Sequence, residues 1–179
     1  TSAMMASASS GVSVGAEPAG SAGWPSPSVT HIEPTGRQRE VPAFSGAMAG
    51  DGADGVVVGG AQGSDAQLTR RTAEGSLVWE RVFPGPLREH AYAVASQAPG
   101  AIVLAGTFET TIDLGGGPLS GGGAFLGAFT ADGTHRWSRS VGQAQPLALV
   151  FDLQGNVVVT GYFGETINLG GGLLTSQSC

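Results

Sequence analysis

The chain has 179 residues, with 31 glycines, 10 prolines and a charged fraction of only 12%. This composition suits many short strands and tight turns better than a helical bundle, and 41% hydrophobic residues are too many for a wholly disordered chain. The net charge of −6 arises from fourteen acidic residues against eight arginines, and there is no lysine. These features exclude lysine nucleophiles and argue against nucleic-acid binding, which requires a concentrated cationic face.

Residues 1–42 are rich in Ala, Ser, Gly and Pro and show no sustained period of 2 or 3.6. We predict a disordered, low-complexity leader or linker there. Linkers of this kind commonly separate a surface attachment point from a folded domain, which favours export. No signal peptide and no apolar run of about twenty residues is visible, and the start at Thr1 is what a processed protein or an excised fragment would show.

Residues 43–179 form the second predicted region, because one pattern recurs in it. Three apolar runs end in a glycine: Gly55–Gly60, Gly100–Gly106 and Gly155–Gly161. The closing glycines are 46 and 55 residues apart. Self-similarity at this period indicates a repeat architecture, in which each unit packs against its neighbours.

A second landmark follows the first in the same order. Trp79 and Trp137 each lie four residues after the glycine of an acidic-Gly turn. The interval from closing glycine to tryptophan is 19 residues in the first unit and 31 in the second, which indicates an insertion in the second unit. The extra residues lie in or near Phe108–Leu119, and Phe163–Leu174 repeats them 55 residues later.

Turn chemistry predicts the strands of the fullest copy, which are Ala124–Thr130, His135–Val141, Leu147–Phe151 and Asn156–Phe163. The Asp-Gly and Gly-Asn steps between them supply the positive φ angles that hairpins need. The run Val157–Val159 lacks alternation, which predicts a strand covered on both faces. The predicted fold is all-β, with β-propeller-like blades of antiparallel strands in an incomplete propeller of about two to three blades.

The Asp/Gly-rich turn, the following tryptophan and the run Asp152–Gly161 together resemble the bacterial seven-bladed β-propeller repeat family. The resemblance covers residues 46–179 and implies a secreted, periplasmic or cell-surface protein. Thr130–Trp137 is more distantly similar to quinoprotein repeats, although the Gly-Lys step of that family is missing here.

Propellers close with about four to eight blades, and about two and a half units are visible in this sequence. A short array of such units leaves an apolar end exposed. We therefore expect a fragment of a longer protein, or an association that completes a ring. The expected partners are the remaining blades of a longer chain, further copies of this one, and an unknown protein or glycan ligand.

Catalytic, cofactor-binding and metal-binding residues are not assigned, and no cofactor is expected. Gly11–Gly15 fits the pattern of a hydrolase nucleophile elbow, but it lies in the leader without the strand and helix that present the serine. His31, His90 and His135 share no short metal-ligand spacing. His135 and Trp137 are expected on one side of a strand, so His135 is either a pocket residue or, more simply, a surface or interblade residue.

Two further motifs allow either a ligand site or a plain turn. Asp51 and Asp54 resemble part of a calcium loop, although such a loop needs several more oxygen ligands. Gly115–Gly117 and Gly170–Gly172 could cradle phosphate only at the start of a helix. Because no helix is predicted after them, hairpin tips are the better interpretation.

The remaining candidates are interpreted structurally. The equivalent positions of Trp79 and Trp137 favour packing over ligand stacking. Arg70 and Arg71 are expected on a solvated strand face. Cys179 is the only cysteine, so an intramolecular disulfide is impossible.

The leading functional hypothesis is a non-enzymatic binding or scaffold module of an exported or surface protein. It would contact protein or glycan through loops at the blade edges. The alternatives are part of a propeller enzyme, either a quinoprotein-like oxidoreductase or a glycan-degrading enzyme, and a purely structural spacer. Fold alone does not choose among them.

Overall fold

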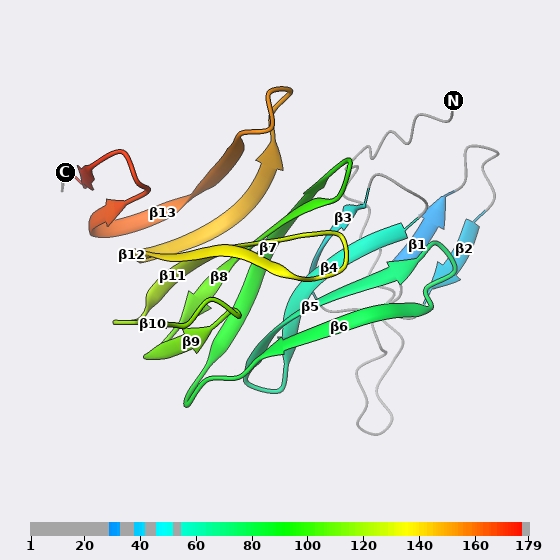
Figure 1. The fold of residues 1–179 in the computed structure, drawn as a ribbon, viewed down its shortest axis with the longest axis horizontal. Coiled ribbons are helices and arrows are strands. Elements are labelled where there is room, and N and C mark those ends of the chain that lie inside the picture. Colours follow the sequence, from blue (N-terminus) through cyan, green and yellow to red (C-terminus); the bar gives the residue numbers. More distant parts are fainter. Residues whose placement is uncertain (1–28, 33–37, 42–45, 52–54, 177–179) are drawn as a thin grey trace, which may run out of the picture.

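The computed structural model describes residues 29–32, 38–41, 46–51 and 55–176. These residues form antiparallel β-strands and no helix, which confirms the all-β prediction. Within the same residues, nothing helical is long and apolar enough to cross a bilayer. The sheets stand in sequence along the longest axis of the molecule and do not close into a ring within the described part (Figure 1).

Unit 1 is a four-stranded sheet whose strands pair in chain order. It consists of β3 (Gly46–Gly50), β4 (Gly55–Gln62), β5 (Asp65–Thr72) and β6 (Leu77–Phe83). Short turns join neighbouring strands, so the sheet is a simple meander.

Unit 2 repeats this meander and adds a hairpin between its second and third strands. Its sheet contains β7 (Glu89–Gln97), β8 (Ala101–Phe108), β11 (Gly123–Phe129) and the first part of β12 (His135–Phe151). The insertion forms a separate two-stranded sheet of β9 (Thr111–Asp113) and β10 (Pro118–Ser120). The predicted place of the extra residues is therefore confirmed.

Unit 3 comprises the rest of β12, then β13 (Val157–Asn168) and β14 (Leu173–Thr175). The sequence predicts two strands, His135–Val141 and Leu147–Phe151, where the structure has the single strand β12. The register of β12 against β13 shifts between Gly142 and Ala144 and again between Pro146 and Ala148. These irregularities let one strand serve two units, because a bulge bends and twists a strand without ending it.

Two short strands, β1 (Val29–Ile32) and β2 (Gln38–Val41), pair as a hairpin ahead of unit 1. We call this pair the leading hairpin. It falls inside the range that the sequence assigns to the leader, so ordered backbone begins before the predicted boundary at residue 42. Residues 1–28 lie outside the described residues, and there the leader stays a prediction.

The main core lies between units 1 and 2 and is closed by the inserted hairpin. Phe83 of β6 meets Phe129 of β11 with ring centroids 5.5 Å apart, and Ile112 and Leu114 of the insertion are each 1% exposed. The insertion therefore acts as an apolar wedge between the two sheets. The buried members of this core are Val57, Ala66, Leu68, Phe83, Ala91, Val94, Ile102, Leu104, Phe108, Ile112, Leu114, Phe125 and Phe129.

The other face of unit 2 carries a smaller core of Ala93, Ala105, Ala124, Leu126 and Val141. Unit 3 covers this face less completely. Three residues before the closing glycine, Val57 and Val103 are 0% and 2% exposed, whereas Val158 is 50% exposed. The prediction that Val157–Val159 is covered on both faces is therefore wrong for the described chain, because β13 has no sheet packed on its outer face.

Candidate functional site

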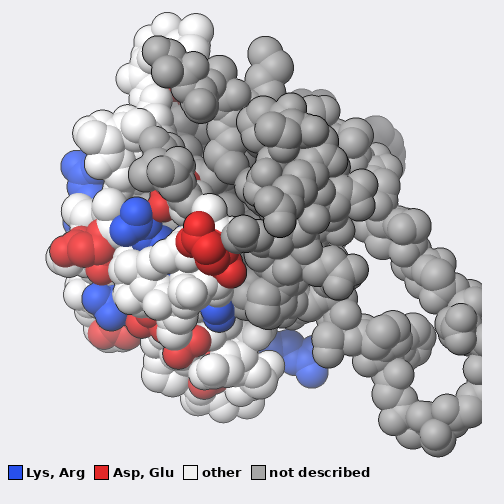
Figure 2. Space-filling view, turned by 90° about the vertical axis from the view of Figure 1, so that its right-hand side faces the viewer, with Lys and Arg blue, Asp and Glu red and all other residues white. Residues whose placement is uncertain are grey.

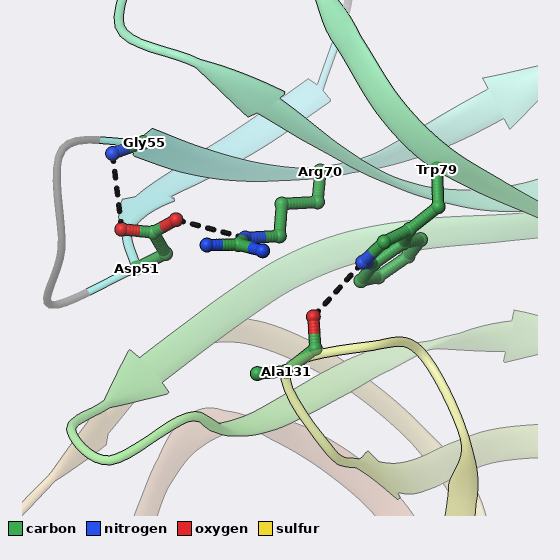
Figure 3. A network of polar contacts seen from close by, with 5 residues as sticks. All are labelled: Asp51, Gly55, Arg70, Trp79 and Ala131. Carbon is green, nitrogen blue, oxygen red and sulfur yellow. Dashed lines mark hydrogen bonds and ion pairs between the residues drawn. The ribbon is translucent and has the colours of Figure 1, made fainter.

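Trp79 joins unit 1 to unit 2 through the turn between β11 and β12. Its indole Nε1 donates a hydrogen bond to the carbonyl oxygen of Ala131 at 2.9 Å (Figure 3). Arg81, two residues along β6, donates from Nε to the carbonyl oxygen of Gly133 at 3.2 Å, and its guanidinium carbon lies 5.9 Å from the Trp79 ring centroid. Trp79 therefore packs between the two units, as predicted, and also forms a hydrogen bond to the turn of unit 2.

Gly133 is required in that turn for two reasons. Its φ of +79° lies in the left-handed region that side chains disfavour. A Cβ built there would also lie 3.1 Å from Cε3 of Trp79. The acidic-Gly motif therefore provides both the turn conformation and a flat surface for the ring of the preceding unit.

The acidic residue of the turn organises its backbone. Asp132 accepts hydrogen bonds from the amide of Thr134 at 3.2 Å and from the hydroxyl of Thr130. The Thr130 hydroxyl is the largest of the contacts that lower the pKa of the Asp132 carboxyl. Asp152 holds its own turn through Asn156, whose side-chain amide and backbone amide lower the pKa of Asp152.

The aspartate considered for calcium binding is engaged within unit 1. Asp51 is 8% exposed and accepts hydrogen bonds from Nε of Arg70 at 2.9 Å and from the amide of Gly55 at 3.0 Å (Figure 3). Asp54 lies outside the described residues. No cluster of three or more potential metal-ligating side chains occurs in the part of the chain that the structure describes. Arg70, expected on a solvated strand face, lies on β5 with its side chain 28% exposed and forms the ion pair with Asp51.

The triglycine segments are hairpin tips, as predicted. Asp113 Oδ1 accepts hydrogen bonds from the amides of Gly115 at 2.7 Å and Gly117 at 3.1 Å. In unit 3, Asn168 Oδ1 accepts from the amide of Gly170 at 2.8 Å. An Oδ1 atom at the equivalent position thus shapes each of the two tips.

His135 lies at the seam between units 1 and 2. Its Nε2 is 3.1 Å from the hydroxyl of Ser138, and its ring meets Phe129 edge-on with centroids 6.1 Å apart. A Cβ at Gly115 would be 3.0 Å from the His135 Cβ, so the tip of the insertion packs against this histidine. These contacts all lie within unit 2, and His135 faces unit 1 across the groove described next.

A groove of about 510 Å³ follows this seam at the blade edge. Strand β6, the inserted hairpin and the β11–β12 turn each contribute to its walls. The polar side chains among its lining residues are Arg81, Asp113, Thr134 and His135. Since three elements from two units bring them together, the groove exists only when the units are docked.

Glu89 is a buried carboxylic acid that the sequence interpretation missed. It begins β7, is 0% exposed and donates its backbone amide to the Ser64 carbonyl oxygen at 2.7 Å. Burial is the main cause that raises the pKa of its carboxyl, and the carboxylates of Asp65 and Glu109 act in the same direction. Three polar residues in a row after a proline-containing loop, Arg88–His90, are typical of an exposed segment. The sequence therefore does not predict that Glu89 is buried.

The equivalent of Trp79 in unit 2 is placed differently. Trp137 is 40% exposed, and no acidic-Gly turn of a following unit packs on it among the described residues. Arg139, the counterpart of Arg81, donates instead from Nη1 to the carbonyl oxygen of Leu169 at 2.8 Å. Unit 3 therefore contacts Arg139 of unit 2 through the β13–β14 hairpin. The Trp137 ring of unit 2 remains partly exposed.

The other sequence candidates do not converge on one site. His90 stacks near Tyr92 with ring centroids 4.6 Å apart, and Arg71 donates to the Gly75 carbonyl oxygen at 3.1 Å. Gly11–Gly15, the side chain of His31 and Cys179 lie outside the described residues. On the side of the molecule seen in Figure 2, arginine and acidic side chains are interspersed over the described surface.

Comparison of the sequence with known family models and with curated proteins finds no match. The structure itself defines the class. This is an antiparallel all-β repeat protein whose first two units dock through a tryptophan, an arginine and the turn that they clasp.

Proposed function

We propose that the chain is a non-enzymatic binding or scaffold module of an exported or surface-exposed protein, related to bacterial β-propeller repeats. In this proposal, its blade-edge loops contact a protein or a glycan. The observation that carries it is the seam groove, where strand β6 of unit 1 and two loops of unit 2 bring together a guanidinium, a carboxylate, a hydroxyl and an imidazole.

The size and chemistry of the groove support a ligand of this kind. Its volume of about 510 Å³ lies within the range of small-ligand sites. Hydroxyl-rich glycans and peptide backbones bind through mixed donors and acceptors next to an apolar floor, and here Phe83 and Phe129 lie beneath the polar groups. The alternative of a structural spacer requires no such convergence.

A substitution at the rim tests the proposal without touching the core. Thr134 is exposed and lines the groove, so Thr134→Arg places a long cationic side chain across it. Ser76 occupies the equivalent position in the turn of unit 1, which makes Ser76→Arg the matched control. Both variants and the parent protein are applied to a glycan array and a peptide array at physiological salt.

The expected result is a defined set of glycans or peptides bound by the parent and by Ser76→Arg, with at least tenfold weaker binding by Thr134→Arg. Equal binding by all three proteins would move the site away from the seam. If the parent bound nothing, the spacer alternative would replace the proposal. Turnover of an arrayed glycan by the parent would instead favour the glycan-degrading alternative.

A further inference from the structure

The outer edge of β13 is open where the equivalent strands of units 1 and 2 are paired. In units 1 and 2, β4 lies between β3 and β5, and β8 lies between β7 and β11. The equivalent strand β13 pairs with β12 on one side, but on the other side it pairs with β14 only over Thr166–Asn168. Beyond these pairs, the amide of Ser176 donates to the carbonyl oxygen of Glu165 at 2.8 Å, and from Val157 to Gly164 this second edge has no strand partner among the described residues.

Apolar side chains accompany the open edge. Val158 and Tyr162 of β13 are 50% and 61% exposed, and Leu147 and Val150 of the adjacent β12 are 54% and 57% exposed. A flat, apolar strand edge of this kind is a template for pairing with another chain. A gap of about 200 Å³ lined mainly by apolar side chains also remains between unit 3 and unit 2.

The leading hairpin has the form of the third and fourth strands that unit 3 does not have among the described residues. In units 1 and 2, a turn joins the third strand to the fourth. The last paired residues before the turn are Arg71↔Leu77 in unit 1 and Phe129↔His135 in unit 2. Five residues separate the partners of each pair, and the fourth of these five is glycine. The pair Ile32↔Gln38 closes β1 and β2 around five residues, and again the fourth, Gly36, is glycine.

The complete units also fix the register in which such a hairpin would add. In each complete unit, the third strand pairs with the second strand in the same register. The residue five positions before the glycine of the turn that follows the third strand pairs with the residue three positions before the glycine that closes the apolar run of the second strand. These pairs are Arg70↔Val57 in unit 1 and Ala128↔Val103 in unit 2. The same rule places His31 of β1 opposite Val158 of β13.

We propose that the open edge of β13 binds the leading hairpin of a second copy of this chain. Strand β1 then becomes the third strand of unit 3 and β2 the fourth, which gives unit 3 the same four-stranded meander as units 1 and 2. The outer side of Trp137 faces this added hairpin, as Trp79 faces the β11–β12 turn. The inference is independent of the proposed ligand binding, because it concerns a different face.

Two observations favour a second copy over the chain's own hairpin. The leading hairpin and β13 lie at opposite ends of the longest axis (Figure 1). A ring of three four-stranded sheets is also smaller than the four to eight blades with which propellers close. Two copies that exchange hairpins head to tail supply six such sheets, which lies within that range.

Cysteine pairing tests both the contact and its register. One chain carries His31→Cys and a second carries Val158→Cys, with Cys179→Ser in both, and the two are mixed and mildly oxidised. The matched control replaces Val158→Cys by Leu153→Cys, since Leu153 is 97% exposed in the turn before β13 and off the paired edge. Circular dichroism verifies that every variant keeps its β-structure.

The expected result is a covalent two-chain product from the Val158→Cys mixture at least tenfold above that from the Leu153→Cys mixture. Equal yields in the two mixtures would overturn the proposal. A third chain with both His31→Cys and Val158→Cys distinguishes the source of the hairpin. Crosslinking of this chain within itself, as a monomer, would also overturn the proposal.

Discussion

Trp79 and Trp137 occupy the same position in consecutive units, yet within the described part of the chain only Trp79 meets the turn of a following unit. The difference shows that the tryptophan belongs to the contact between units and not to the sheet that carries it. Its hydrogen bond and its ring packing against Gly133 are separable contributions.

Replacing Trp79 should therefore destabilise the docking of units 1 and 2 in two steps. Trp79→Phe keeps an aromatic ring but loses the donor, at a cost of about 1 kcal/mol in the free energy of unfolding. Trp79→Ala loses the packing as well, at a cost of about 2 kcal/mol or more. Urea unfolding followed by circular dichroism measures both, and equal stability of the Ala and Phe variants would contradict a packing role.

Glu89 makes stability depend on pH through its raised pKa. The folded chain retains the proton in a pH range where the unfolded chain, with a carboxyl pKa near 4.5, releases it. Stability contributed by this site is therefore present at low pH and is lost as the pH rises from the unfolded pKa through the folded pKa.

Glu89→Gln should remove this loss, because the amide stays neutral. The variant is expected to gain stability relative to the parent between about pH 4 and about pH 8. The lowered pKa values of Asp132 and Asp152 reduce the stability of the folded chain in acid. Both proteins contain these two aspartates, so their effect cancels when the stability of the parent is subtracted from that of Glu89→Gln. Urea unfolding at both pH values provides the measurement, and a constant difference would contradict burial of the ionised carboxyl as its cause.

At the scale of elements, the inserted hairpin is a wedge and not a surface decoration. Its tip is shaped by the Asp113 carboxylate, and Ile112 and Leu114 beside it are buried in the core between units 1 and 2. The equivalent hairpin of unit 3 has Leu169 40% exposed where unit 2 buries Leu114.

The two hairpins should therefore respond differently to the same change. Asp113→Ala removes two hydrogen bonds that shape the hairpin tip beside the buried Leu114, and we expect a loss of about 1–2 kcal/mol in the free energy of unfolding. Asn168→Ala, the matched substitution in unit 3, should cost less than about 1 kcal/mol. Thermal unfolding of the two variants gives the comparison, and a larger effect at Asn168 would contradict the wedge role of the first hairpin.

The strands could be predicted largely from the sequence, because glycine-ended runs and acidic-Gly turns report local backbone conformation. The joining of two predicted strands into β12 could not, since it depends on pairing with β13. The candidate site was harder to predict from the sequence than the strands. The ion pair of Arg70 with Asp51 and the burial of Glu89 depend on segments that meet only after folding.

The leading hairpin shows the same limit in another way. Its strands lack the tryptophan and the acidic-Gly step that mark the other units, so the sequence offers only the glycine at position 36 as a signal. Its strand pairing and loop length reveal it as a counterpart of the β5–β6 and β11–β12 hairpins.

At the scale of the whole molecule, the described units form an array with the open edge of β13 at one end and the leading hairpin at the other. Such ends are complementary, and a head-to-tail contact between them repeats the strand order already present in units 1 and 2. The central claim is that two chains complete each other.

The molar mass in solution tests this claim most directly. Light scattering of the full chain during size-exclusion chromatography, at micromolar concentration and physiological salt, is expected to give twice the chain mass of 17.8 kDa. Val158→Arg, which places a charge on the open edge, should shift the protein toward the mass of one chain, while Leu153→Arg should not. A parent protein that elutes as a folded single chain at all concentrations would contradict the account.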